Sequence, residues 1–173
     1  MIDRFAHQLR LEQIRDGERL DLVADDAERE AIACRLGLAR LGRLEAHATL
    51  SRTGQMVRAS GRLAAALDQS CVVTNAPIPA HVDEPFELVF LPGPEVAGPD
   101  EDIELGAQDC DVVFYDGSMI DLGAAIADSL ALSIDPYPRS VGAEAALKEA
   151  GIMTEAEASP FAALAQLKKT DQS

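Results

Sequence analysis

Two adjoining stretches of the chain alternate apolar and polar residues. The alternation runs from Arg43 to Arg52, pauses at Thr53-Gly54 and continues to Asp68. A period of two predicts β-strands with one buried face, and the short connection predicts an antiparallel hairpin. The apolar side chains expected to face the core are Leu44, Ala46, Ala48 and Leu50 in the first strand and Val57, Ala59, Leu63, Ala65 and Leu67 in the second.

Shorter extended segments are predicted at residues 3–9, 18–23, 82–91 and 111–115. Asp16-Gly17 marks a turn between the first two. Pro85 lies inside the third segment and cannot donate a backbone hydrogen bond, so we expect an edge strand or a β-bulge there.

Two helices have recognisable ends. Asp25 or Asp26 can cap a helix that runs to Leu36 and stops at Gly37. Asp121 can cap a second helix over residues 122–134, which Asp135-Pro136 terminates. Residues 142–150 and 160–169 are weaker, alanine-rich helical segments.

These elements predict an α+β fold. We expect an antiparallel sheet of four to six strands, possibly barrel-like, with helices packed on one face. Residues 1–140 would form a single domain with an acidic loop near 92–110, and residues 141–173 a C-terminal helical tail.

Charge is distributed unevenly over the 173 residues, whose formal net charge is −15. Residues 63–138 contain 15 acidic side chains and no lysine or arginine. Such a surface repels nucleic acid as a whole and attracts cationic partners within a Debye length of ~8–10 Å; the alternative is that the acidic excess only keeps the protein soluble. The acidic residues expected to bind a basic partner are Asp100, Glu101, Asp102, Glu104, Asp109 and Asp111.

The hairpin carries most of the candidate cationic contacts. Five side chains are expected on the face opposite the core, where guanidinium groups could bind RNA phosphates or an acidic partner: Arg43, His47, Arg52, Arg58 and Arg62. Glu45 and Asp68 share this face, so a solvated mixed-charge surface is the alternative. No aromatic residue lies there to stack on a base.

Nothing in the sequence predicts catalysis. Cys71 and His81 could belong to a nucleophilic set, but neither sits in a recognisable motif and no base adjoins Cys71 to lower its pKa. Asp100-Glu101-Asp102 lacks the spacing of a calcium loop. Three scattered cysteines, without a Cys-x-x-Cys pair, predict no disulfide framework and no zinc site. We therefore expect no catalytic residue, metal, cofactor or small-molecule substrate.

The chain shows no apolar run of the roughly 18 residues that cross a bilayer and no apolar signal core near residue 1. We expect a cytoplasmic protein with reduced thiols and no membrane partner.

Longer strings of the sequence resemble the YceD family, the large ribosomal RNA subunit accumulation proteins, in its alphaproteobacterial form. The resemblance is carried by AEREAIACRLGLARLGRLEAHATL (27–50), GRLAAALDQSCVVTNAPIPAHVDEPFELVF (61–90) and YDGSMIDLGAAIADSLALSIDPYPR (115–139). It implies a role in producing or stabilising large-subunit ribosomal RNA, and members tend to be encoded beside a small basic ribosomal protein. Many relatives have a second cysteine after the one matching Cys71; here that position is Thr74, which removes a metal or redox role for this chain.

The resulting hypothesis is a non-enzymatic ribosome-biogenesis factor that supports accumulation or processing of 23S ribosomal RNA. Its partners would be a basic large-subunit ribosomal protein, 23S rRNA or its precursor through backbone contacts, or both. The alternatives are an accessory nuclease or hydrolase in rRNA processing and a purely structural interaction module.

Overall fold

The computed structural model describes residues 5, 7–93 and 111–152. Within the chain two compact units are distinguished, one formed by residues 1–69 and 79–136 and the other by residues 70–78 and 137–173. The elements are β1 (Gln8–Arg10), a short 3-10 turn (Leu11–Gln13), β2 (Glu18–Val23), α1 (Asp26–Leu36), β3 (Arg40–Thr53), β4 (Met56–Ser70), β5 (Pro77–Pro92), β6 (Asp111–Tyr115), β7 (Met119–Asp121), α2 (Leu122–Ser133) and α3 (Ala143–Glu149).

The larger sheet has five strands in the order β2-β3-β4-β5-β6, and β1 pairs with β7 in a separate two-stranded sheet. β2 with β3, and β3 with β4, are antiparallel, whereas β5 and β6 run parallel. The predicted α+β class is therefore confirmed, with a mostly antiparallel sheet. The sheet is open, with β2 and β6 as its outer strands, so the possible barrel is not formed.

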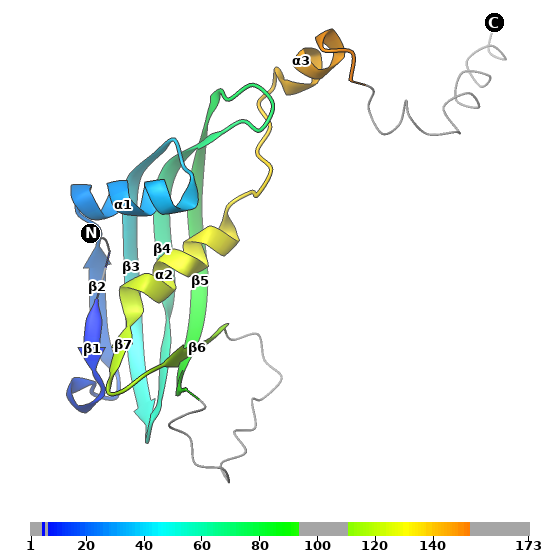
Figure 1. The fold of residues 1–173 in the computed structure, drawn as a ribbon. Coiled ribbons are helices and arrows are strands. Elements are labelled where there is room, and N and C mark those ends of the chain that lie inside the picture. Colours follow the sequence, from blue (N-terminus) through cyan, green and yellow to red (C-terminus); the bar gives the residue numbers. More distant parts are fainter. Residues whose placement is uncertain (1–4, 6, 94–110, 153–173) are drawn as a thin grey trace, which may run out of the picture. The chain divides into compact units, whose positions relative to one another are not determined.

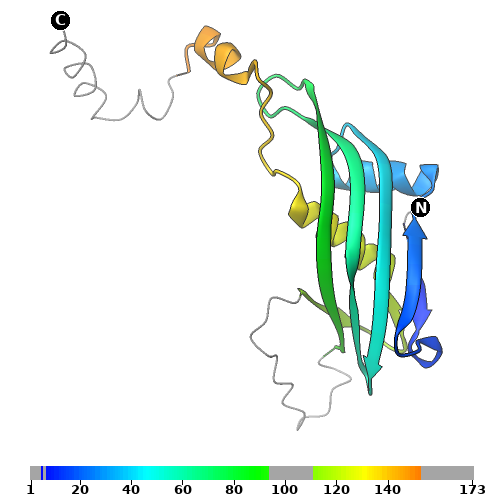
Figure 2. The same cartoon turned by 180° about the vertical axis from the view of Figure 1, so that it is seen from behind.

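Both long helices cover the same face of this sheet. Figure 1 shows α1 and α2 in front of the strands, and Figure 2 shows the opposite face without a helix over β3 and β4. The alternation in the hairpin explains this arrangement, because it places one apolar row on the helix side. Leu50, Val57 and Leu63 on this row are almost completely buried, as are Leu122, Ile126 and Leu130 of α2.

The helix ends follow the sequence signals. Asp25 accepts a 2.8 Å hydrogen bond from the backbone N–H of Glu28, and Glu28 accepts one of 3.0 Å from the N–H of Asp25, which completes a capping box. Gly37 ends α1 in the left-handed region, with φ of 65°. Asp121 caps α2 through the N–H of Ala124 at 2.9 Å. α2 ends at Ser133, one residue before the predicted end.

The strand predictions needed several corrections. β5 begins at Pro77 and lies between β4 and β6. β6 pairs only with residues 88–92 of β5, so Pro85 lies where β5 has no partner strand on that side among the described residues, as expected of a proline at a sheet edge. The sequence missed β7 and expected no parallel pair.

Other predicted segments fall partly outside the described residues. α3 lies within the predicted helix at 142–150. The helix at 160–169 and nearly all of the acidic loop at 92–110 lie outside the described residues, as do residues 3, 4 and 6 of the first predicted strand. β1 overlaps the end of that predicted strand. The division into one domain and a helical tail stays a prediction.

Candidate partner-binding site

The sheet face opposite the helices carries four of the five predicted cationic side chains. In the antiparallel register His47 lies opposite Arg62, and Arg58 lies opposite Ser51. Arg43 lies opposite Ala66, beyond an irregularity at Leu41/Arg43. Directly opposed residues share a face, and all four cationic side chains are exposed.

Arg52 is on the other face, contrary to the prediction. It lies opposite Val57, whose side chain is fully buried, and it has the same parity as Leu50. Its guanidinium donates to the backbone carbonyl of Leu11 and, at 2.9 Å, to that of Gly54. Its position in the alternation already contained this signal, because the even-numbered positions of β3 from Leu44 to Leu50 face the core.

Carboxylates occupy the outer face together with the cations. Arg43 pairs with Glu45 at 2.6 Å, Arg62 with Asp83 at 2.5 Å, and Arg58 with Glu87. His47 Nδ1 lies 2.6 Å from Asp21 of β2. The surface is therefore a mixed-charge network, which is the alternative considered for this face.

The pKa shifts agree with this pairing. The hydrogen bond to Asp83 raises the pKa of Arg62, and the hydrogen bond to Glu45 raises that of Arg43. The same contact with Arg43 lowers the pKa of Glu45. The charged forms are thus mutually stabilised, so an RNA phosphate would compete with carboxylates already in place.

Sequence reasoning missed Asp21, Asp83 and Glu87 as members of this face. The polar positions of residues 82–91 carried part of the signal, because Asp83 and Glu87 alternate with Val82 and Phe86. Their pairing with β4 arginines depended on strand neighbours that the sequence left open.

Of the six acidic residues predicted to bind a basic partner, only Asp111 is described. It is exposed at the start of β6, opposite Leu88. Asp100, Glu101, Asp102, Glu104 and Asp109 lie outside the described residues.

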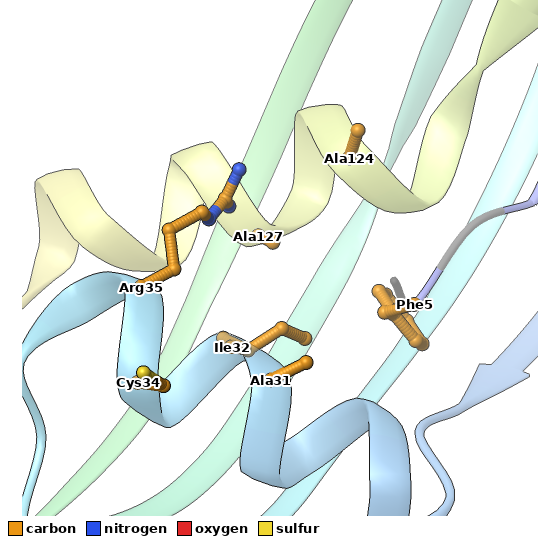
Figure 3. Close-up of a pocket in the computed structure, with 7 residues that line it drawn as sticks. All are labelled: Phe5, Ala31, Ile32, Cys34, Arg35, Ala124 and Ala127. Carbon is orange, nitrogen blue, oxygen red and sulfur yellow. The ribbon is translucent and has the colours of Figure 1, made fainter. Parts of the chain in front are cut away.

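A groove lies between α1 and α2 (Figure 3). Its volume is about 530 Å³. Ala31 and Ile32 project from α1 toward Phe5, and Arg35 extends from α1 toward α2. The described residues that line it are Phe5, Ala31, Ile32, Cys34, Arg35, Ala124 and Ala127. Its walls are therefore mainly apolar.

A smaller hollow of about 180 Å³ adjoins this groove, because Phe5 lines both. His7, Asp21, Leu22, Val23 and Glu28 also line the smaller hollow. The carboxylate of Asp21 itself contacts His47, which lies on the outer face of the sheet. No sequence motif predicted this groove, which requires α1, α2 and Phe5 to lie side by side.

Cys71 has an unexpected environment in the turn after β4. Its sulfur accepts hydrogen bonds from the backbone N–H of Thr74 at 3.4 Å and from both the N–H and the hydroxyl of Ser140, at 3.2 and 3.4 Å. The hydrogen bonds from Ser140, followed by those from Thr74, lower the pKa of the Cys71 thiol to about 6. Sequence reasoning considered only a neighbouring base and missed these hydrogen-bond donors, which can stabilise a thiolate without one.

We expect a thiolate titration to reveal this environment. In a Cys34→Ser, Cys110→Ser background, thiolate absorbance at about 240 nm should rise with a midpoint near pH 6. Ser140→Ala removes the hydroxyl donor and should move the midpoint upward. Ser60→Ala, at an exposed position of β4, should leave the midpoint unchanged. A midpoint near the ordinary value of 9.0 in the parent would contradict the assignment.

The same shift has a definite sign for stability. An unfolded chain holds the thiol proton up to about its ordinary pKa of 9.0, whereas the folded chain releases it near 6. Stability from this group therefore rises with pH between these values and is lost as pH falls through 6. Cys71→Ser should flatten that part of the melting-temperature profile.

Within the described ranges, no group of three or more His, Cys, Asp or Glu side chains is placed to hold a metal ion. Within the same ranges, no helix has the length and apolar character needed to cross a membrane.

Together these features define an α+β protein with an open sheet, helices on one face and paired charges on the other. Residues 59–168 match the family model described as large ribosomal RNA subunit accumulation protein YceD. The match covers more than half of the chain, which therefore belongs to the YceD family. The family name implies a role in the accumulation of large-subunit ribosomal RNA. No curated protein and no solved structure matches the chain.

Proposed function

We propose that this chain supports 23S rRNA accumulation as a non-enzymatic factor that binds a basic large-subunit ribosomal protein. The family match over residues 59–168 carries the proposal. Ribosomal proteins that bind rRNA carry excess positive charge, and the −15 charge of this chain complements it. The place of action would be the cytoplasm, where the rRNA and its proteins assemble.

The outer sheet face supports a protein partner over RNA. Arg43 and Arg62 each pair with a carboxylate at 2.5–2.6 Å, and Arg58 pairs with Glu87. Phosphate contacts from these arginines would replace existing ion pairs, while the whole molecule repels a polyanion. A cationic protein meets neither obstacle.

Direct contact with 23S rRNA or its precursor is the second candidate. One observation favours it, namely that Arg58, Arg62 and Arg43 lie on a single exposed sheet face. Such contacts would go to the phosphate backbone and carry no sequence information.

Affinity purification of the tagged full-length chain tests the proposal. We expect a basic large-subunit ribosomal protein to co-purify and to remain after ribonuclease treatment. The triple variant Arg43→Gln, Arg58→Gln, Arg62→Gln should retain that partner. Loss of the partner after ribonuclease treatment or in the triple variant would favour the RNA candidate, and turnover of precursor rRNA by the purified chain would overturn the non-enzymatic assignment.

A further inference from the structure

We propose that β6 pairs with an extended basic segment of a protein partner through its outer edge. The segment would add a strand to the five-stranded sheet. In this mode of recognition, backbone hydrogen bonds supply affinity and alternate side chains supply specificity. The inference rests on the proposed function in expecting a cationic partner, and it adds the binding surface and the conformation of the bound segment.

The outer edge of β6 offers backbone groups for a further strand. β6 is the last strand of the sheet, and among the described residues only β5 pairs with it there. The N–H of Gly93 donates to the carbonyl of Tyr115 at 2.9 Å, so Tyr115 directs its backbone groups toward β5. Because backbone groups alternate in direction along a strand, those of Val112 and Phe114 point to the outer edge.

The side chains at this edge favour strand pairing. Phe114 is 62% exposed, and Val112 beside it is half-buried. Phe114 lies opposite Leu91, which is 3% exposed, and opposed residues share a face. An apolar residue of an added strand would lie next to Phe114 and continue this row across the sheet. β-branched and aromatic side chains pack best on such a surface.

Other edge positions of the same sheet carry features that discourage pairing. On the side that faces β6, β5 has Pro79 and Pro85, both at odd-numbered positions whose N–H groups would point to that side. β2, the opposite edge strand, has the exposed charged residues Arg19 and Asp21. Prolines and charged side chains are the usual protection of edge strands. Residues 112–115 contain neither, which marks β6 as the edge that is open to a partner.

The charges around β6 favour a basic segment. Asp111 begins the strand and Asp116 follows it, and both are exposed. Residues 63–138 contain no lysine or arginine. Arg52 lies near Tyr115, but its guanidinium donates to backbone carbonyls on the core side of the sheet. Lysines at the ends of an added strand would therefore meet carboxylates, whereas an acidic segment or a second copy of β6 would be repelled.

A fluorescein-labelled synthetic peptide tests the inference on the full-length chain. Valine and threonine alternate in its centre, and two lysines stand at each end. One matched peptide carries N-methyl groups on its central amides, which removes the backbone donors and keeps the charge. A second replaces every lysine with glutamate. We expect the basic peptide to bind at least about tenfold more tightly than either control.

Edge variants assign the binding to β6. Val112→Pro removes an outward N–H and leaves the backbone bonds to β5 in place, so it should weaken peptide binding about tenfold or more. Phe114→Lys places a charge on the edge and should have a similar effect. Leu132→Lys is the matched control, because Leu132 is 77% exposed on α2, and it should leave the affinity unchanged. Circular dichroism of each variant verifies that it is folded.

Hydrogen exchange measured by NMR gives a readout on the unsubstituted chain. The N–H groups of Val112 and Phe114 should exchange rapidly in the free chain and become protected about tenfold or more by saturating peptide. The N–H of Val113, which points toward β5, should already be protected. Unchanged exchange at Val112 and Phe114 with saturating peptide, or unchanged affinity in folded Val112→Pro, would overturn the inference.

The outcomes also separate this inference from the proposed function. Equal binding of the N-methylated peptide would show attraction by charge alone and would overturn strand pairing, while leaving a ribosomal partner possible at another surface. Pairing of the peptide with β6, without any ribosomal protein in the purification, would retain the edge and reject the proposed function. Dimerisation that Val112→Pro abolishes would identify a second copy as the occupant and overturn the assignment to a cationic partner.

Discussion

Gly61→Ala is expected to lower the free energy of unfolding by about 3 kcal/mol or more. Gly61 lies in β4 opposite Ala48. A Cβ atom there would lie 1.8 Å from the backbone carbonyl oxygen of His47 and 3.0 Å from the Cα of Ala48. Backbone atoms of β3 cannot rotate away as a side chain would, so the two central strands must separate.

Urea denaturation of purified variants measures this effect. Ser60→Ala, at the adjacent exposed position, should change the unfolding free energy by no more than about 0.5 kcal/mol. A Gly61→Ala protein as stable as the parent would show that β3 and β4 are not held as closely as described.

Phe90→Ala is the second large effect, with an expected loss of about 3–5 kcal/mol. Phe90 lies on β5 opposite Val113 of β6 and is 1% exposed. Truncation removes buried apolar contacts and leaves a cavity beside strands that can close only partly around it.

Leu132→Ala on α2 is the matched control, because Leu132 is 77% exposed. It should change stability by no more than about 0.5 kcal/mol. Comparable losses for the two variants would be inconsistent with a core between the sheet and the helices.

The sequence predicted features that local patterns determine. The hairpin followed from alternation at Leu44, Ala46 and Leu50, since one strand face had to be buried. The ends of α1 followed from Asp25 and Gly37, whose side-chain acceptor and left-handed backbone act within one turn.

Features that depend on distant neighbours were missed. β7 has three residues and depends on pairing with β1, more than 100 residues earlier. The sulfur of Cys71 takes hydrogen bonds from Ser140, 69 residues away. The carboxylate partners of Arg58 and Arg62 required the neighbouring position of β5, and the groove required two helices to meet over one sheet face.

Arg52 is a different case, because its alternating position already favoured the core face. The prediction placed Arg52 on the outer face because its side chain is charged, although the alternation pointed to the core face. The structure satisfies the guanidinium with backbone carbonyls of Leu11 and Gly54 at the end of the sheet, so a cation at a core-parity position is accommodated without reaching the outer face.

The proposed function requires the chain to bind a basic large-subunit ribosomal protein by complementary charge. Its most direct test is the dissociation constant for the purified large-subunit ribosomal protein that co-purifies with the chain, measured by calorimetry at about 50 mM and about 500 mM salt. We predict binding at low salt that weakens about tenfold or more at high salt, as screening shortens the range of charge attraction. The absence of binding at low salt would contradict the account.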